Sequence, residues 1–241
     1  MPGVTKGGRL RARPLVHYAD ATAFTVKGKV MAVVIAFRLQ TLPGHYEQAL
    51  DAYLPWVDEL EDNVVDLQLT ALGGDPASGT IHAAAVYEHA EVAEGLASLP
   101  FFAGLVDRLE PHLAAMPERL ELDLVNLFAI NTPLGTEGLD DAVLIEADWH
   151  IKLGHVDELL ANYEPFVVTF LEQVPEARIV VESVHRASGL MRAAIVFDNA
   201  ASAESGRTME LLSEFIGSVE HLLSAPPVRS ELRLLHLFAR G

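Results

Sequence analysis

The sequence predicts an α+β fold in which two tandem ferredoxin-like (βαββαβ) units form an intramolecular α+β barrel. Three observations predict it. The chain aligns with itself after a shift of 110 residues, and each half carries the pattern strand, helix, strand, strand, helix, strand. Half of the 241 residues are hydrophobic, which is enough to bury a core in both halves.

The repeat covers residues 32–129 and 142–239 without a gap, and about three positions in ten are identical. A unit of this length is too long for a solenoid repeat. We therefore divide the chain into an N-terminal extension at 1–29, a first ferredoxin-like repeat at 30–129, a linker of turn-forming residues at 130–140 and a second repeat at 141–241. The end of the extension alternates enough to form an edge strand.

The strands and helices are predicted at matching positions of the two repeats. Each repeat opens with an apolar, β-rich run, and a Gly-His turn then leads into a segment with helical periodicity. A hairpin, a second helical region that Pro100 interrupts in the first repeat only, and a last strand follow. The predicted ranges are 31–39, 46–60, 65–72, 80–87, 91–115 and 120–128, and then 143–151, 156–170, 177–184, 190–197, 203–225 and 230–238.

Each predicted sheet has one face that its own helices do not cover. In such a unit the helices cover one face of the antiparallel sheet, and the other face remains to be buried against a partner, which the second repeat supplies. We therefore expect the two sheets to face each other across one internal cavity of ligand size. The prediction of an enzyme depends on that cavity, because side chains that filled it would remove the predicted site.

Composition excludes several classes of partner. The formal net charge is −17, from 34 acidic and 17 basic residues, and no stripe of Lys or Arg could neutralise phosphates, so nucleic acid and membrane surfaces are poor partners. The absence of Cys excludes disulfides and thiolate chemistry. No apolar run approaches the length of a membrane span. We expect a soluble cytoplasmic protein, either a monomer or a homodimer.

The first strand of the second repeat carries the predicted catalytic groups. Glu146, Asp148 and His150 fall on one face of this strand by its period of two. Unpaired carboxylates beneath the helices would be costly, so the barrel interior is the favoured place for them, as a base cluster. A pseudo-twofold axis could bring Arg38 of the first repeat near the acids. The alternative is a salt bridge that only closes the barrel.

Five further residues complete the predicted substrate-binding set with Arg38. His82 and Arg192 occupy matching positions on the third strands, and Asn126 and His236 occupy matching positions on the last strands. All four are polar intrusions into apolar faces, for which a satisfied buried side chain is the alternative. Trp149 could stack on a flat aromatic ligand, or belong to the core.

Several segments resemble the antibiotic biosynthesis monooxygenase (ABM) superfamily. They are residues 86–89, 96–102 and 109–111, which look like its third strand and second helix, and 42–44 before the first helix. The resemblance extends over about 200 residues as two diverged copies. A two-copy member of this kind is similar to the oxygenases that open the B ring of angucycline polyketides.

The resemblance implies oxygenation of a reduced polycyclic phenol by O2 without a tightly held metal. In some members reduced flavin (FADH2 or FMNH2) assists, which implies a flavin reductase as a partner. Where other members have Trp after the third strand, this chain has His89 and Asn199, so their mechanistic details do not transfer.

Two other functions stay open from the sequence. One is a haem enzyme of the chlorite dismutase type, with His185, His221 or His236 as the axial ligand. The other is a non-catalytic module that binds an aromatic intermediate. The sequence lacks the G-x-S-x-G, H-E-x-x-H, Walker and G-x-G-x-x-G motifs, so hydrolase, zincin, nucleotide triphosphatase and Rossmann dehydrogenase functions lose support.

Overall fold

The computed structural model describes residues 32–129 and 140–240. It confirms the predicted fold class, because each repeat contributes four strands with helices between them. The predicted N-terminal edge strand and residues 130–139 of the linker lie outside the described residues. The first repeat consists of β1 (Val33–Gln40), α1 (Tyr46–Asn63), β2 (Leu67–Asp75), β3 (Thr80–Tyr87), α2 (Ala90–Gly95), α3 (Pro100–Leu109) and β4 (Glu118–Ala129). The second consists of β5 (Val143–Ile151), α4 (Val156–Gln173), β6 (Ala177–His185), β7 (Leu190–Phe197), α5 (Ala200–Thr208), α6 (Glu210–Val219) and β8 (Leu223–Ala239).

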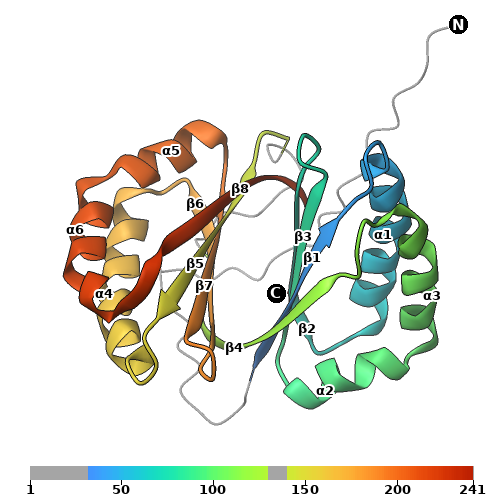
Figure 1. The fold of residues 1–241 in the computed structure, drawn as a ribbon, viewed down its shortest axis with the longest axis horizontal. Helices are drawn as coiled ribbons and strands as arrows, with labels where there is room; N and C mark the ends of the chain where they lie inside the picture. The colour runs from blue at the N-terminus through green and yellow to red at the C-terminus, as the bar shows by residue number, and fades with distance from the viewer. Residues whose placement is uncertain (1–31, 130–139, 241) are drawn as a thin grey trace, which may run out of the picture.

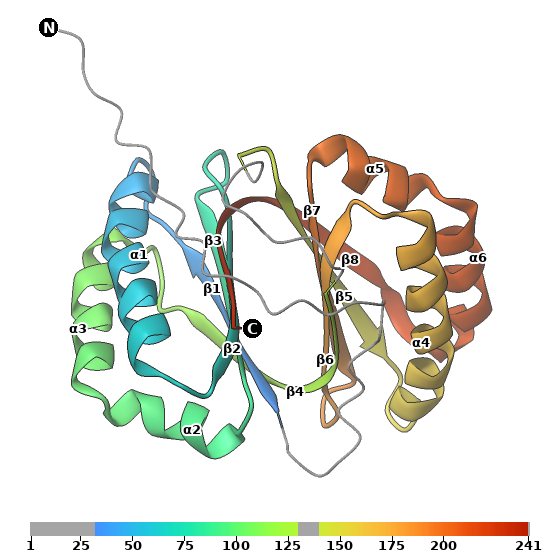
Figure 2. The ribbon, with the colours of Figure 1, turned by 180° about the vertical axis from the view of Figure 1, so that it is seen from behind.

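The eight strands close into one barrel in the order β1-β3-β2-β8-β5-β7-β6-β4. Two strands make the closure, because β4 pairs with β6 of the second repeat and β8 pairs with β2 of the first. Figures 1 and 2 show both strands crossing from one half of the molecule to the other. Every strand is therefore paired on both edges, and the barrel has no free edge of the kind that invites aggregation.

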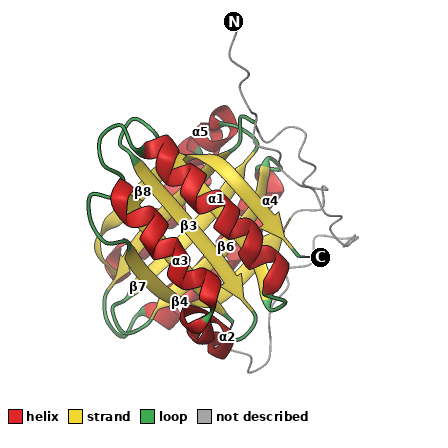
Figure 3. Ribbon diagram, turned by 90° about the vertical axis from the view of Figure 1, so that its right-hand side faces the viewer, coloured by secondary structure: helices red, strands yellow, loops and turns green. Residues whose placement is uncertain are grey.

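The helices lie outside the barrel, with α1 and α3 over one side and α4 and α6 over the opposite side (Figures 1 and 3). Each long helix buries one stripe against its sheet, as the apolar spacing predicts. In α1 the buried residues are Tyr46, Ala49, Leu50, Tyr53, Trp56, Val57 and Leu60. None of the described helices combines the length and the apolar character needed to cross a bilayer.

The second helical region is divided in both repeats, so the prediction of an interruption in the first repeat only is wrong. Leu99 has an extended backbone before Pro100, and Met209 has the same conformation at the matching position. The carbonyl of Met209 accepts hydrogen bonds from the backbone N–H groups of Leu212 and Ser213, which starts α6. Met209 packs against the core between the helices and the sheet of the second repeat. This packing, and not a proline, accompanies the break in the helical region there.

The expectation of a ligand-sized chamber between the sheets is also wrong. The ribbon in Figure 1 leaves a gap there, but the inward side chains form a core of their own and leave a space of only about 20 Å³. An eight-stranded barrel is just wide enough for its inward side chains to fill. The fully buried members of this core include Val34, Leu69, Val86, Leu122, Leu144, Ile179, Val196 and Leu232.

Candidate active site

A larger cavity, of about 170 Å³, lies between the sheet and the helices of the first repeat. It exists because three alanines, Ala83 and Ala85 on β3 and Ala93 on α2, lie opposite the large side chains of α1. Short side chains on one wall leave the space that a tightly packed interior would otherwise fill. An enzymatic site in this molecule therefore has to be sought beneath the helices and not inside the barrel.

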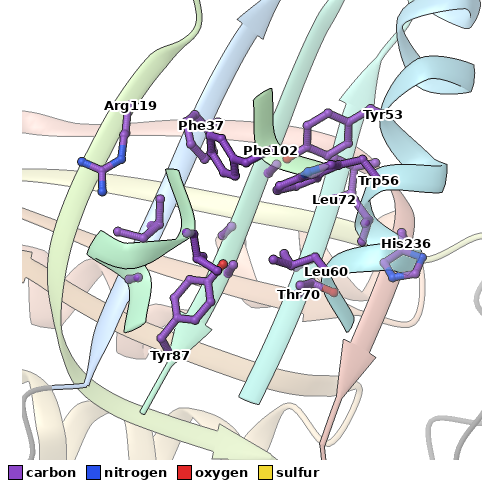
Figure 4. A pocket seen from close by; sticks show the side chains of 18 of the residues that line it. Phe37, Tyr53, Trp56, Leu60, Thr70, Leu72, Tyr87, Phe102, Arg119 and His236 are labelled. Carbon is purple, nitrogen blue, oxygen red and sulfur yellow. The ribbon is translucent and has the colours of Figure 1, made fainter. Parts of the chain in front are cut away.

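Five aromatic side chains line the cavity together with aliphatic ones (Figure 4). They are Phe37, Tyr53, Trp56, Tyr87 and Phe102. The Trp56 and Phe102 rings meet edge to face with their centroids 5.4 Å apart, and Tyr53 lies 5.5 Å from Trp56. Rings in such contacts present apolar faces and edges to a flat ligand. A cavity of about 150 Å³ is known to bind benzene, so this one, of about 170 Å³, accommodates at least one aromatic ring.

A hydrogen-bonded pair lies at one end of the cavity. His236 comes from β8 of the second repeat and lines the cavity wall, and its Nε2 lies 2.6 Å from Oε1 of Glu61 on α1. The hydroxyl of Thr70 donates to the same carboxylate oxygen. An ionised carboxylate only accepts, so Glu61 selects the tautomer with the proton on Nε2 and leaves Nδ1 as the basic nitrogen. In this tautomer the imidazole can accept a proton at Nδ1.

The opposite end of the cavity carries a cation, and two phenols belong to the cavity wall. Figure 4 shows Arg119 at the far side from His236, with Tyr87 between them. The Arg119 side chain is 45% exposed and its guanidinium lies 2.9 Å from the Glu121 carboxylate, so Arg119 forms part of the rim. Burial raises the pKa of Tyr87 and the pKa of Tyr53, so both phenols stay neutral hydrogen-bond donors.

The structure brings five predicted site residues together inside the barrel, in an ion cluster. Asp148 accepts from Arg192 Nε at 2.7 Å and from Arg38 at 2.6 Å, which confirms the proximity expected from the pseudo-twofold axis. His82 Nδ1 lies 2.8 Å from Glu146 Oε2. The cluster links β1 and β3 of the first repeat to β5 and β7 of the second.

The acids of this cluster remain ionised. Burial acts to raise the pKa of Glu146 and of Asp148, but hydrogen bonds from His82 and Arg192 and the guanidinium charges outweigh it, so the pKa of each carboxyl is lowered. A strongly paired carboxylate of low pKa is a weak general base. The geometry supports the salt-bridge alternative, and the catalytic role of Glu146, Asp148 and His150 stays a prediction.

The other predicted site residues lie apart from this cluster. His150 is exposed. Trp149 is buried beneath the helices, edge-on to Tyr163 and Phe215 at 5.8 Å from each. Of the remaining haem-ligand candidates, His185 and His221 are exposed, and neither lines a cavity described here. Asn126 donates to Glu182 Oε2 at 2.7 Å beneath α4.

Glu182 gives a pH-dependent prediction. Burial raises its pKa to about 7, because the Asn126 hydrogen bond compensates only in part. Between about pH 4.5 and 7 the folded state holds a proton that the unfolded state releases, so this group makes the protein less stable as pH rises. We expect Glu182→Gln to raise the free energy of unfolding by about 3 kcal/mol at pH 8 and to change little at pH 4.5. Urea unfolding at the two pH values measures this.

The exposed Glu172 is the matched control for this experiment. Glu172→Gln removes the same charge from the same repeat and should change stability by less than about 0.5 kcal/mol at either pH. Equal effects of Glu182→Gln at pH 4.5 and pH 8 would show that the carboxyl does not titrate in this range.

Comparisons with known proteins bear on the fold. No protein-family model matches the sequence, and no curated protein sequence matches it significantly. Solved structures do match. A proposed monooxygenase from Fusobacterium nucleatum has a TM-score of 0.75 at 11% identity, with 88% of this chain and 96% of that chain covered. One from Lactobacillus acidophilus has a TM-score of 0.70 at 11% identity, covering 88% and 97%.

A third match is described as an anthrone oxidase-like protein, with a TM-score of 0.64, 12% identity and coverage of 91% of this chain and 97% of that one. The chain shares its fold with these proteins. They match over nearly their whole length, so the arrangement of two joined units is common to them and to this chain.

Sequence analysis identified His236 but missed its partner Glu61 and the aromatic wall. Glu61 follows the buried Leu60 at the edge of the apolar stripe of α1, a position where acids are usual on exposed helix faces. Its imidazole partner comes from the other repeat, on β8. The signal that could have located the wall is the run of alanines at 83–85, opposite a helix rich in aromatic residues.

Proposed function

We propose that the chain is an oxygenase that uses O2 to oxidise a reduced phenolic aromatic compound in the cavity of the first repeat. The observation that carries this proposal is the His236–Glu61 pair on the wall of an aromatic-lined cavity. Such a site combines a base, a flat apolar slot and protection from water, which is what a cofactor-independent reaction of a phenol with O2 requires. The similarity in fold to a protein described as anthrone oxidase-like supports it.

Three residues have separate roles in the proposed reaction. His236 Nδ1 accepts the phenolic proton, and Glu61 stabilises the imidazolium that results. The phenolate reacts with O2 far more readily than the phenol. For a methylene of the anthrone type, one oxygen atom enters as the carbonyl and the other leaves in water, so the substrate supplies all four electrons. Arg119 at the rim can hold negative charge that develops on oxygen.

The size of the cavity limits what is enclosed. We propose a polycyclic phenol of the anthrone or angucycline type with one or two rings inside, because about 170 Å³ does not enclose a tetracyclic skeleton. A second, apolar cavity of about 60 Å³ shares Phe37, Tyr53 and Phe102 with the first and extends past Val106 and Met116. The rings that do not react would lie along that extension.

The proposed reaction needs no flavin, because an anthrone-type substrate supplies all four electrons. The cavity of about 170 Å³ would enclose only part of a flavin, as it would of the substrate, and we derive no step from flavin.

The test is an aerobic turnover assay with 1,8-dihydroxyanthrone under 18O2. We expect conversion to the quinone at a rate well above that of buffer, with one labelled oxygen in the product by mass spectrometry. The same mixture under argon is the control. Failure to convert any anthrone or angucycline-type phenol above the buffer rate would overturn the proposal.

A further inference from the structure

We infer that the chain has a single active site, in the first repeat, and that the second repeat has become a closed copy that contributes His236 to that site. The inference rests on the proposed function for what the site does, but the number of ligand sites can be tested without it. A tandem duplication would by itself give two equivalent sites. The number of ligand sites per chain therefore depends on the side chains and not on the fold.

The space beneath the helices of the second repeat is filled by aromatic side chains. Phe215 of α6 stacks on Phe166 with centroids 4.3 Å apart and an interplanar angle of 16°. The same ring lies 5.4 Å from Tyr163 and 5.8 Å from Trp149. Phe166 also contacts Phe170 at 5.8 Å. All of these side chains are less than 10% exposed, so they form a continuous core where the first repeat has its cavity.

Position-by-position comparison shows which side chains close the copy. The shift of 110 residues places Ile195 at the position of Ala85, and Phe170 at the position of Leu60. Ala85 and Leu60 both line the cavity of the first repeat. Leu105 stands where the second repeat has Phe215. At each of these three positions the second repeat has the larger side chain.

The imidazole is also missing from the corresponding place in the second repeat. Asn126 stands at the position that matches His236, and like His236 it crosses to the other repeat and bonds to a carboxylate, that of Glu182. An amide cannot act as a proton acceptor of useful strength. The second repeat thus retains the hydrogen-bonded arrangement but lacks both the cavity and the imidazole.

Titration calorimetry with 1-naphthol, a two-ring phenol, tests the count on the full chain. We expect one ligand per chain. Ala85→Ile, which installs the residue of the second repeat, should weaken binding at least tenfold, and the reverse change Ile195→Ala should leave the first site intact. Leu60→Phe is the second blocking variant if Ala85→Ile does not fold, with folding judged by near-UV circular dichroism.

The outcomes separate this inference from the proposed function. Two naphthol molecules per chain, no saturable binding, or loss of binding in Ile195→Ala with retention in the blocking variant would each overturn the single site. One naphthol per chain together with no oxidation of any anthrone would leave the count standing and remove only the oxygenase activity.

Discussion

The Asp148→Ala variant is expected to lose about 3–5 kcal/mol of unfolding free energy at pH 7. Asp148 accepts hydrogen bonds from both Arg38 and Arg192, and Arg192 is almost fully buried. Removing the carboxylate leaves the buried guanidinium of Arg192 without its hydrogen-bonded partner, and the nearest remaining carboxylate is Glu146 at 3.9 Å. The cost of that desolvated charge exceeds the value of an ordinary ion pair. Urea denaturation measures the change.

Asp157→Ala is the matched control, because Asp157 also pairs with an arginine, Arg186, but at the surface, where the two side chains are 84% and 51% exposed. A loss below about 1 kcal/mol is expected there. Because the pKa of Asp148 is lowered in the folded state, this carboxylate stabilises the protein at neutral pH. That stabilisation is lost as pH falls through the folded-state pKa. Equal small losses in the two variants would contradict a structural role for the cluster.

The His236→Asn variant should lower kcat for the phenol by about 10²–10⁴ fold, the range that a positioned general base contributes. Asn is the residue at the matching position of the other repeat, where it bonds to a buried carboxylate, so the substitution keeps a donor for Glu61 while removing the basic nitrogen. Binding of 1-naphthol should be retained. Initial rates of 1,8-dihydroxyanthrone oxidation, with binding measured separately, check both expectations.

The exposed His221 provides the control, because His221→Asn removes an imidazole from the second repeat without touching the cavity. The kcat of the His221→Asn variant should equal that of the unmodified chain. Undiminished turnover in His236→Asn would remove the base assignment, whereas loss of naphthol binding in that variant would show that His236 holds the ligand.

The sequence was sufficient to predict the barrel but not the positions of the site residues. Two β-bulges are the reason. Asn126 and His236 were predicted to bind substrate, but the sequence did not give the face of the sheet on which they lie. The pairing of β4 with β6 shifts register between Leu124 and Asn126, and the pairing of β8 with β2 shifts between Leu72 and Gly73. A bulge changes which face the following residues occupy. Both side chains consequently lie beneath the helices.

The cavity itself was unpredictable for a different reason. Helical periodicity identifies which residues of α1 are buried, but not whether the opposite strand fills the space between them. That depends on residue size at matched positions, such as Ala85 against Trp56, and the strand and helix come together only in the folded barrel. The prediction of an open chamber between the sheets was wrong for the same kind of reason. Inward Leu, Val and Ile side chains fill a space that the topology alone leaves open.

The exchange of β4 and β8 between the repeats makes the cavity of the first repeat depend on the second. β8 is translated after every other described element, and it brings the imidazole of His236 to a cavity built from the opposite half. On the proposed mechanism, a nascent chain without β8 would have no proton acceptor. Activation of a phenol toward oxygen would then require both repeats to have folded.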